Sequence, residues 1–175
     1  MGKKTAPPDA ELDADGLVIQ RYRSMVLVVV PRSEFGEECL RYARASLYNV
    51  HVGTKVVSLS EEDPVQGRLQ DTFLVDGTAS GEAMASYSGL VLAGGEGALE
   101  LARDPDVLRL VREAAQAGKL LGAWGHSVAL LAATGVLKGR RVTCHPAVRD
   151  TVKQAGARLT TRQVEVDGNL VTASD

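Results

Sequence analysis

The residues whose types could support catalysis gather in two short stretches. Residues 125–129 read G-H-S-V-A, which fits the G-x-S-x-[GA] pattern of the serine-hydrolase nucleophile elbow and would make Ser127 the nucleophile. His145 lies downstream as a conceivable general base, and Cys144 beside it is another candidate nucleophile. The chain shows no obvious acid in the order that such a triad requires. The pattern alone therefore does not establish a hydrolase.

The turn that carries this motif is itself typical of an elbow. Residues 120–134 read LLGAWGHSVALLAAT, an apolar strand that passes through small residues into an apolar helix. Such a turn lifts one side chain clear of the sheet, close to main-chain N–H groups that stabilise an anion. Gly125 stands where that side chain is expected, and glycine presents none. The local architecture favours an active site, whereas this residue argues against the usual activity.

The cysteines and histidines form no disulfide or metal pattern. Cys39 and Cys144 lie far apart without C-x-x-C spacing, so we expect free thiols. Cys144 and His145 are adjacent at an expected strand end, and adjacent strand residues point to opposite faces, so they cannot easily share a metal. We expect no metal, no cofactor, structural histidines and an inert thiol at Cys144.

Length and composition limit what the chain can be. At 175 residues it suits one domain, which would bury about 70% of its unfolded surface. The formal net charge is -2 and basic residues are scattered, which argues against a nucleic-acid partner. No apolar run approaches the roughly 20 residues of a membrane span, and no secretory signal is evident. We therefore expect a cytoplasmic protein without a membrane partner.

The first half of the chain alternates strands and helices after an N-terminal extension. Residues 1–20 form the extension, which is expected to be mobile at least to Asp15. Residues 25–31 are an apolar, β-branched run, typical of a strand covered on both faces. Ser33 is expected to cap a helix that continues to about Tyr48. Further strands are expected at residues 55–59, 73–75 and 89–92.

The second half gives clearer signals. Asp104 is an N-cap followed by Pro105 at the first helical position, and Gly118 ends that helix. Two alternating strands around Asp167-Gly168-Asn169 indicate a hairpin. Between these elements we expect a helix ending near Gly135, a strand at residues 141–143 and a helix at residues 147–155. The repeating β-α units predict a mostly parallel sheet with helices on both faces and ligands beyond the carboxyl ends of its strands.

Four segments in this order resemble the ThiJ/PfpI superfamily. They are GLVLAGG at residues 89–95, AATGVLKGRRVTCHP at residues 132–146, RDTVKQAGA at residues 149–157 and VEVDGNLVT at residues 164–172. The resemblance implies a flavodoxin-like three-layer α/β/α sandwich, related to the class I glutamine amidotransferases, over residues 21–175. It also implies a final helix that covers one sheet face, which this chain lacks.

Two departures from the superfamily pattern fall at its active site. Members resemble A-x-C-H-G at the elbow, and Gly125 stands in place of that cysteine. The glutamate that bonds the thiol from the first βα turn is replaced by Gly36. The paired loss removes both the nucleophile and the group that tunes its protonation, which favours a catalytically inactive protein. The alternative is that each glycine meets a backbone need, such as a positive φ.

The resemblance also places other residues around this vestigial site. His126 matches the histidine after the missing cysteine, and His145 matches a strand-end histidine, so both should border one cleft. Gly94 and Gly95 would supply oxyanion-type N–H donors, which could still bind an anion or a water. Ser127 falls in the first helical turn, where a hydroxyl more often caps a helix. The candidate ligand-binding residues are Gly94, Gly95, Gly125, His126 and His145.

The sequence leaves two main functions open. The preferred one is a catalytically inactive family member that binds a small metabolite or a protein partner through the old cleft. The alternative is a hydrolase or a glyoxalase/deglycase-like enzyme that uses Ser127, Cys144 or His145 in a rearranged site. A purely structural subunit, which would bind no ligand, is a third.

The sheet face left by the missing helix needs a cover. We expect a homo-oligomer, most simply a dimer, since a partner subunit would cover it. The rival cover is the N-terminal extension, in which residues 16–20 could add an edge strand.

Overall fold

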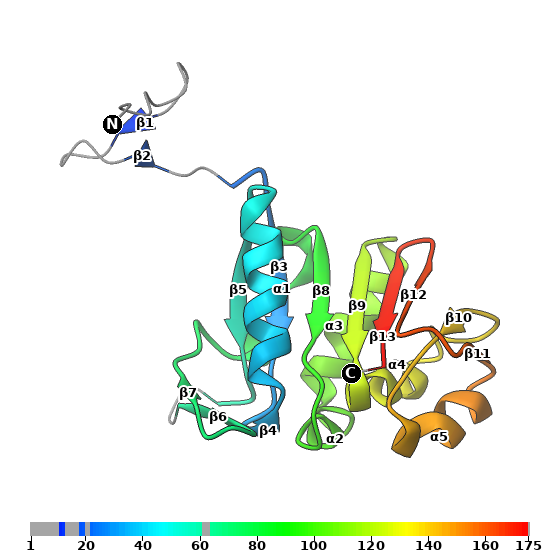
Figure 1. The fold of residues 1–175 in the computed structure, drawn as a ribbon. Coiled ribbons are helices and arrows are strands. Elements are labelled where there is room, and N and C mark those ends of the chain that lie inside the picture. The colour runs from blue at the N-terminus through cyan, green and yellow to red at the C-terminus, as the bar shows by residue number, and fades with distance from the viewer. Residues whose placement is uncertain (1–10, 13–17, 20–21, 61–63, 175) are drawn as a thin grey trace, which may run out of the picture.

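The central sheet follows from the alternation of strands and helices along the chain. The computed structural model describes residues 11–12, 18–19, 22–60 and 64–174. Six strands form the sheet in the order β12-β13-β9-β8-β3-β5, and only the hairpin of β12 and β13 is antiparallel (Figure 1). They are β3 (Ser24–Val29), β5 (Val52–Val57), β8 (Gly89–Leu92), β9 (Leu120–Trp124), β12 (Val164–Asp167) and β13 (Leu170–Ala173). The predicted mostly parallel α/β architecture is confirmed.

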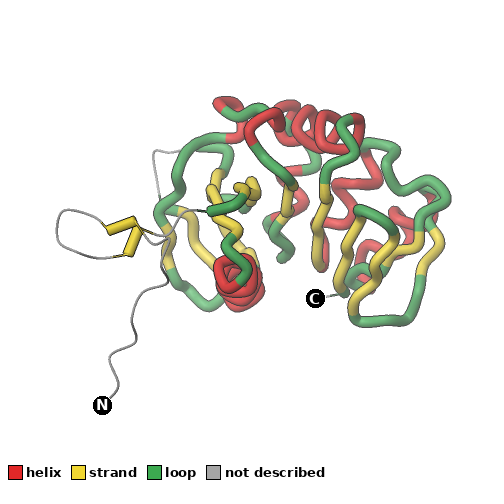
Figure 2. Tube along the Cα trace, turned by 90° about the horizontal axis from the view of Figure 1, so that it is seen from above, coloured by secondary structure: helices red, strands yellow, loops and turns green. Residues whose placement is uncertain are grey.

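Helices cover the two faces of this sheet. Helix α1 (Glu37–Asn49) lies on one face, whereas α3 (Pro105–Gln116) and α4 (Val128–Ala133) lie on the other (Figures 1 and 2). Two hydrophobic cores result, and Leu40 of α1 belongs to one and Leu110 of α3 to the other. The shorter helices are α2 (Ala98–Leu101), α5 (Arg149–Gln154) and the 3-10 turns η1 (Ala79–Gly81), η2 (Met84–Ser86), η3 (Gly125–Ser127) and η4 (Pro146–Val148). No helix among the described residues is long and apolar enough to cross a membrane.

Three small sheets lie outside the central one. They are β1 (Glu11–Leu12) with β2 (Val18–Ile19), β4 (Ser33–Phe35) with β6 (Val65–Gly67) and β7 (Thr72–Phe73), and β10 (Arg141–Val142) with β11 (Arg158–Leu159). Strand β2, the described part of the predicted edge strand at residues 16–20, pairs with β1 and not with the central sheet. The rest of the predicted mobile extension lies outside the described residues.

The start of α1 differs from the prediction. Gly36 is the N-cap and Glu37 the first helical residue, so the predicted cap at Ser33 is wrong. Ser33 instead lies in β4, paired in register with Gln66 of β6. The Gly36 amide then donates to the Gly94 carbonyl at 3.0 Å, which holds the chain extended up to the helix. Contacts between segments that are distant in the sequence therefore override the local capping signal.

Other local signals agree with the structure. The Asp104 carboxylate accepts hydrogen bonds from the amides of Asp106 and Val107, both at 3.0 Å, which confirms the predicted cap of α3. Gly118 follows α3 with φ +63°, and Gly168 has φ +59° in the predicted hairpin turn. The conformations of this helix cap and of these two turns depend on residues a few positions apart, so the sequence alone was sufficient to predict them.

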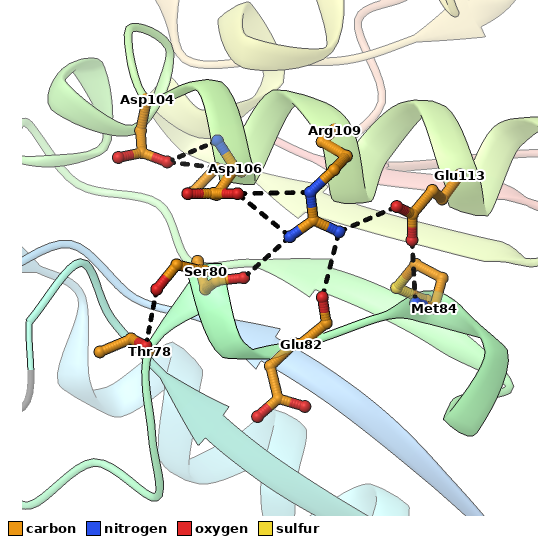
Figure 3. Close-up of polar contacts among 10 residues, drawn as sticks. Thr78, Ser80, Glu82, Met84, Asp104, Asp106, Arg109 and Glu113 are labelled. Carbon is orange, nitrogen blue, oxygen red and sulfur yellow. Dashed lines mark hydrogen bonds and ion pairs between the residues drawn. The ribbon is translucent and has the colours of Figure 1, made fainter.

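A single guanidinium ties α3 to the chain that precedes β8. Arg109 donates to Asp106 and Glu113 of its own helix, at 3.2 Å and 2.8 Å (Figure 3). Its two terminal nitrogens also donate to the carbonyls of Ala79 at 3.3 Å and Glu82 at 3.1 Å. The segment that contains η1 and η2 is therefore fastened to α3 by charge-assisted hydrogen bonds.

The α1 face of the sheet is apolar beyond α1 itself. Val164 and Val166 of β12 are 54% and 55% exposed, and Leu120 of β9 is 42% exposed. The alternate residue Glu165 is buried, so the two valines point to the opposite face. Figure 2 shows no helix over this face beside the C-terminal hairpin in the part of the chain that is described.

Candidate functional site

The elbow forms as its sequence predicts. Strand β9 ends at Trp124, η3 makes the turn and α4 follows, at the carboxyl edge of the parallel strands, the lower edge in Figure 1. Gly125 at the apex has φ +60°. A Cβ built on Gly125 would meet nothing closer than the Gly94 Cα and the Gly95 nitrogen, both at 3.8 Å. Gly125 is buried, and a Cβ would therefore fit there in van der Waals contact with the Gly95 amide nitrogen.

Gly94 and Gly95 are glycines for steric reasons. A Cβ on Gly94 would overlap the backbone of Trp124, whose carbonyl carbon would lie 2.8 Å away. Gly95 has φ +121°, and its Cβ would overlap the Glu34 carbonyl oxygen and lie 2.6 Å from the Cα of Phe35. Close approach of three backbone segments thus requires both glycines. It also holds the Gly95 amide beside the elbow.

Gly36 has no such constraint. Its φ is -78°, and a Cβ there would lie 3.9 Å from the Cys39 Sγ and 4.0 Å from the Trp124 Nε1. The Trp124 Nε1–H is buried and has no hydrogen-bond acceptor among the described residues. A side chain at position 36 would therefore fit, and an acceptor there would lie near an unpaired indole N–H. Neither sterics nor φ explains this glycine.

The two histidines of the prediction lie together beside the elbow. The His126 and His145 rings stack with centroids 4.1 Å apart and an interplanar angle of 23°. The His145 amide donates to the Gly125 carbonyl at 3.3 Å, which fixes the histidine next to the apex. The His145 Nδ1 accepts from the Ala147 amide at 3.2 Å and so caps η4. The structure thus brings together Gly94, Gly95, Gly125, His126 and His145.

Ser127 is not arranged as a nucleophile. Its side chain is fully buried, and its Oγ lies 2.9 Å from the carbonyl oxygens of Leu92 and Trp124. The same oxygen accepts a hydrogen bond from the Trp124 amide at 3.2 Å. These bonds fasten the elbow to the end of β8 and occupy the hydroxyl. Ser127 therefore acts as a structural tie.

The thiols do not replace the missing nucleophile either. Cys144 is 6% exposed, and burial raises the pKa of its thiol, although nearby Arg149 lowers it in part. A thiol that stays neutral near physiological pH is a poor nucleophile. Cys39 lies on α1 and packs against the core of that sheet face. Among the described residues no three His, Cys, Asp or Glu side chains are grouped to hold a metal ion.

Sequence reasoning missed two buried groups near the elbow. One is the unpaired indole N–H of Trp124. The other is Glu37, which is 1% exposed and accepts a hydrogen bond from the Leu69 amide through Oε1. A carboxylate in the first turn of a helix is ordinarily a surface residue. Gly67 packs directly against Glu37, and a Cβ on Gly67 would overlap the Glu37 carboxylate. The burial of Glu37 is evident only from this tertiary contact.

The fold and this site define a flavodoxin-like α/β protein with a strand–turn–helix elbow whose apex is Gly125. Comparison with protein families matches residues 24–175 to the DJ-1/PfpI family. The chain belongs to this family, and the resemblance to the ThiJ/PfpI superfamily is confirmed.

Individual relatives agree with this assignment. An uncharacterized protein of Methanocaldococcus jannaschii is 32% identical over 151 residues, which cover 85% of this chain and 73% of the relative. A protein of Thermococcus kodakarensis named as a deglycase is 36% identical over 94 residues, 50% of this chain and 52% of that protein. Among solved structures, a ThiJ/PfpI domain protein from Brachyspira murdochii is 25% identical with a TM-score of 0.82, covering 86% of each chain.

Proposed function

We propose that this protein is a catalytically silent member of the DJ-1/PfpI family that binds a small polar ligand at the elbow without covalent chemistry. The observation that carries the proposal is Gly125, which keeps the elbow conformation and presents no side chain at the apex, although a Cβ would fit there. Ser127 is bonded inside the turn, and Cys144 is buried with a raised pKa. Covalent catalysis needs an accessible, activated nucleophile, and the described residues offer none at the apex.

The groups around the apex favour a ligand with a carbonyl or carboxylate oxygen. The Gly95 nitrogen lies 3.8 Å from the Cβ position of Gly125, held there by close backbone packing. The stacked rings of His126 and His145 border the same turn. A fixed amide with neighbouring imidazoles suits an oxygen acceptor, because it requires no rearrangement on binding.

The binding proposal is tested by adding a side chain at the apex. Asparagine tolerates positive φ better than other side chains, so Gly125→Asn should keep the turn while occupying the position beside the Gly95 amide. We expect metabolites that raise the melting temperature of the wild type to lose that effect in Gly125→Asn. Gly139→Asn is the matched control, because Gly139 also has positive φ, +74°, and has no atom within 4 Å of its Cβ position. Equal stabilisation of wild type and Gly125→Asn would place binding elsewhere.

The absence of turnover is tested separately. The purified protein would be assayed with methylglyoxal and with activated esters, beside Ser127→Ala, Cys144→Ala and His145→Ala. We expect no turnover above that of heat-denatured protein. Turnover that one of these substitutions abolishes would contradict the proposal and identify the residue that carries the chemistry.

The same assay addresses the alternative, a deglycase-like or hydrolase activity. What favours that alternative is the printed activity of relatives, since proteins of Thermococcus kodakarensis and Pyrococcus horikoshii that match this chain are named as deglycases. Such an activity here would have to use His145 or a buried group in place of the apex side chain. A loss of turnover confined to His145→Ala would favour it.

Restoring the missing groups provides a stronger test of the framework. In Gly125→Cys with Gly36→Glu, a Cβ fits at both positions, so we expect a thiol whose alkylation persists below pH about 7, because the introduced carboxyl, when protonated, donates a hydrogen bond to the thiolate and lowers the thiol pKa. Gly125→Cys alone should show weaker thiolate character. Alkylation mapped by mass spectrometry separates the introduced thiol at position 125 from those of Cys39 and Cys144. Equal reactivity of the single and double variants would show that the site no longer supports a thiolate.

A further inference from the structure

A pocket lies near the elbow at the carboxyl edge of the sheet. Its volume is about 180 Å³, and it lies between the β10–α5 connection and the β11–β12 connection. Ser174 on its wall follows Ala173, which pairs in register with Trp124. The pocket is thus one strand away from Gly125 but is lined by different residues. Ligands of open α/β sheets bind beyond the carboxyl ends of the strands, where this pocket lies.

The charged residues among the described lining of this pocket are both arginines. Arg149 and Arg162 both line it. The Arg162 Nη1 lies 3.8 Å from the Glu165 Oε1, and the Arg141 Nε lies 3.5 Å from the same oxygen, so two guanidiniums share one carboxylate. Arg149 makes no ion pair with any acidic side chain in the described part of the chain. An anion in the pocket would therefore supply a charge partner for Arg149 that the described residues do not.

The rest of the wall is rich in hydroxyl groups. Thr143, Thr160, Thr161 and Ser174 line the pocket. The Thr160 hydroxyl is buried, and it has no hydrogen-bond partner among the residues that the structure describes. Cys144, which also lines the pocket, is held neutral by burial and adds no negative charge. Buried hydroxyls are ordinarily paired, so the unpaired Thr160 hydroxyl, in the wall of the same pocket as Arg149, marks a place for an acceptor.

We propose that this pocket binds a small oxyanion, a phosphate or carboxylate group, with Arg149 as its charge partner and the threonine hydroxyls as further donors. The volume suits a single such group rather than a whole cofactor. A guanidinium can donate two parallel hydrogen bonds to either oxyanion, and hydroxyls fill the remaining acceptor positions. The site goes beyond the proposed function, because it requires neither an active nor a silent elbow.

The test is a titration of the purified protein with inorganic phosphate, phenyl phosphate and acetate at constant ionic strength. Binding would be followed by calorimetry and by amide chemical shifts of residues 143, 160, 161 and 174. We expect saturable binding of at least one oxyanion, with shifts confined to the pocket. Tighter binding of phenyl phosphate than of inorganic phosphate would indicate the end group of a larger metabolite, and the reverse a free ion; both support the site.

Two variants separate the site from general electrostatics. Arg149→Gln should weaken binding by about tenfold or more, as expected when a charge-assisted hydrogen bond is lost. Arg158→Gln makes the same charge change on exposed β11, outside the pocket, and should bind as the wild type does. Equal weakening in both variants, or no saturable binding by the folded wild type, would overturn the proposal. Gly125→Asn should leave this binding intact, which keeps it distinct from the elbow site.

Discussion

At the scale of single residues, the glycines of the site fall into two groups. Gly94 and Gly95 are required because a Cβ at either position would overlap neighbouring backbone. Gly36 and Gly125 have room for a Cβ. Gly125 has a positive φ that favours glycine, but Gly36 has an ordinary φ. The glycine at position 36 is therefore not a steric or conformational requirement.

Substitution of Gly95 tests this distinction. Gly95→Ala should lower the free energy of unfolding by about 3 kcal/mol or more, because positive φ and overlap with the Glu34 carbonyl both oppose a Cβ. Gly135→Ala is the control, since Gly135 has φ +76° but nothing within 4 Å of its Cβ position. Its loss should be only about 1–2 kcal/mol. Urea unfolding measures both free-energy losses. Similar losses in the two variants would show that the positive φ, and not steric overlap, determines the cost of a Cβ at Gly95.

At the scale of elements, Arg109 is one of several groups that hold the chain between β7 and β8, beside the Lys55–Glu82 ion pair and backbone hydrogen bonds to β5. Its 3-10 turns bury Ala79 and Met84, and the Met84 amide donates to Glu113 of α3 at 3.0 Å. Arg109 adds hydrogen bonds to two carbonyls of the same segment (Figure 3). Helix α3 thus positions β8 indirectly, and β8 leads into Gly94 and Gly95.

Arg109→Met should therefore destabilise the protein. The change leaves two carbonyls and two carboxylates without their shared donor, and we expect a loss of about 1–3 kcal/mol in urea unfolding. Arg112→Met is the matched control, because Arg112 lies on the same helix and is exposed. Its effect should stay within about 0.5 kcal/mol. Hydrogen exchange should also speed up at residues 79–86 in Arg109→Met only; equal effects in both variants would contradict this role.

At the scale of the whole molecule, the uncovered sheet face bears on assembly. We expect a homodimer in which a second copy covers the exposed Val164 and Val166, because contiguous exposed apolar side chains are typical of interaction surfaces. Light scattering after size-exclusion chromatography should give a dimer mass. Val164→Lys with Val166→Lys should give a folded monomer, while lysines at exposed Tyr42 and Leu74 should not. A wild-type monomer at micromolar concentration would contradict the expectation.

Stability should fall on acidification. Burial alone would raise the pKa of Glu82, but hydrogen bonds from Lys55 and Tyr87 outweigh it, so the pKa is lowered. The amide of Met84 and the guanidinium of Arg109 likewise lower the pKa of Glu113. A carboxylate with a lowered pKa stabilises the fold above its unfolded pKa and loses that contribution as pH falls through the folded value.

Urea unfolding across pH checks this. We expect a plateau above pH about 5 and a decline between about pH 5 and 3, where carboxylates of ordinary pKa titrate. Lys55→Gln removes the charge 2.6 Å from Glu82 and should make the decline shallower. Stability that is unchanged from pH 7 to 3, or an equally steep decline in Lys55→Gln, would contradict the assignment.

Local signals account for what could be predicted from the sequence. Asp104 with Pro105, and the Asp167-Gly168-Asn169 turn, are settled by residues a few positions apart, and both are as predicted. Ser33 fails as a cap because its backbone pairs with Gln66, far along the chain. The burial of Glu37 and the unpaired N–H of Trp124 also arise from contacts between distant segments. The sequence identified where the site is, but not which of its polar groups are satisfied.

The position of Trp124 gives the protein an internal optical reporter. It is the only tryptophan in the 175 residues, and its buried indole adjoins the turn where we propose that ligands bind. Emission excited at the red edge of the protein spectrum therefore comes from this one ring, without labelling. A ligand oxygen that approaches the indole N–H, or a shift of the nearby Cys39 sulfur, would change the wavelength or the intensity of the tryptophan emission. Occupancy of the elbow can thus be followed in real time by the fluorescence of the unmodified chain.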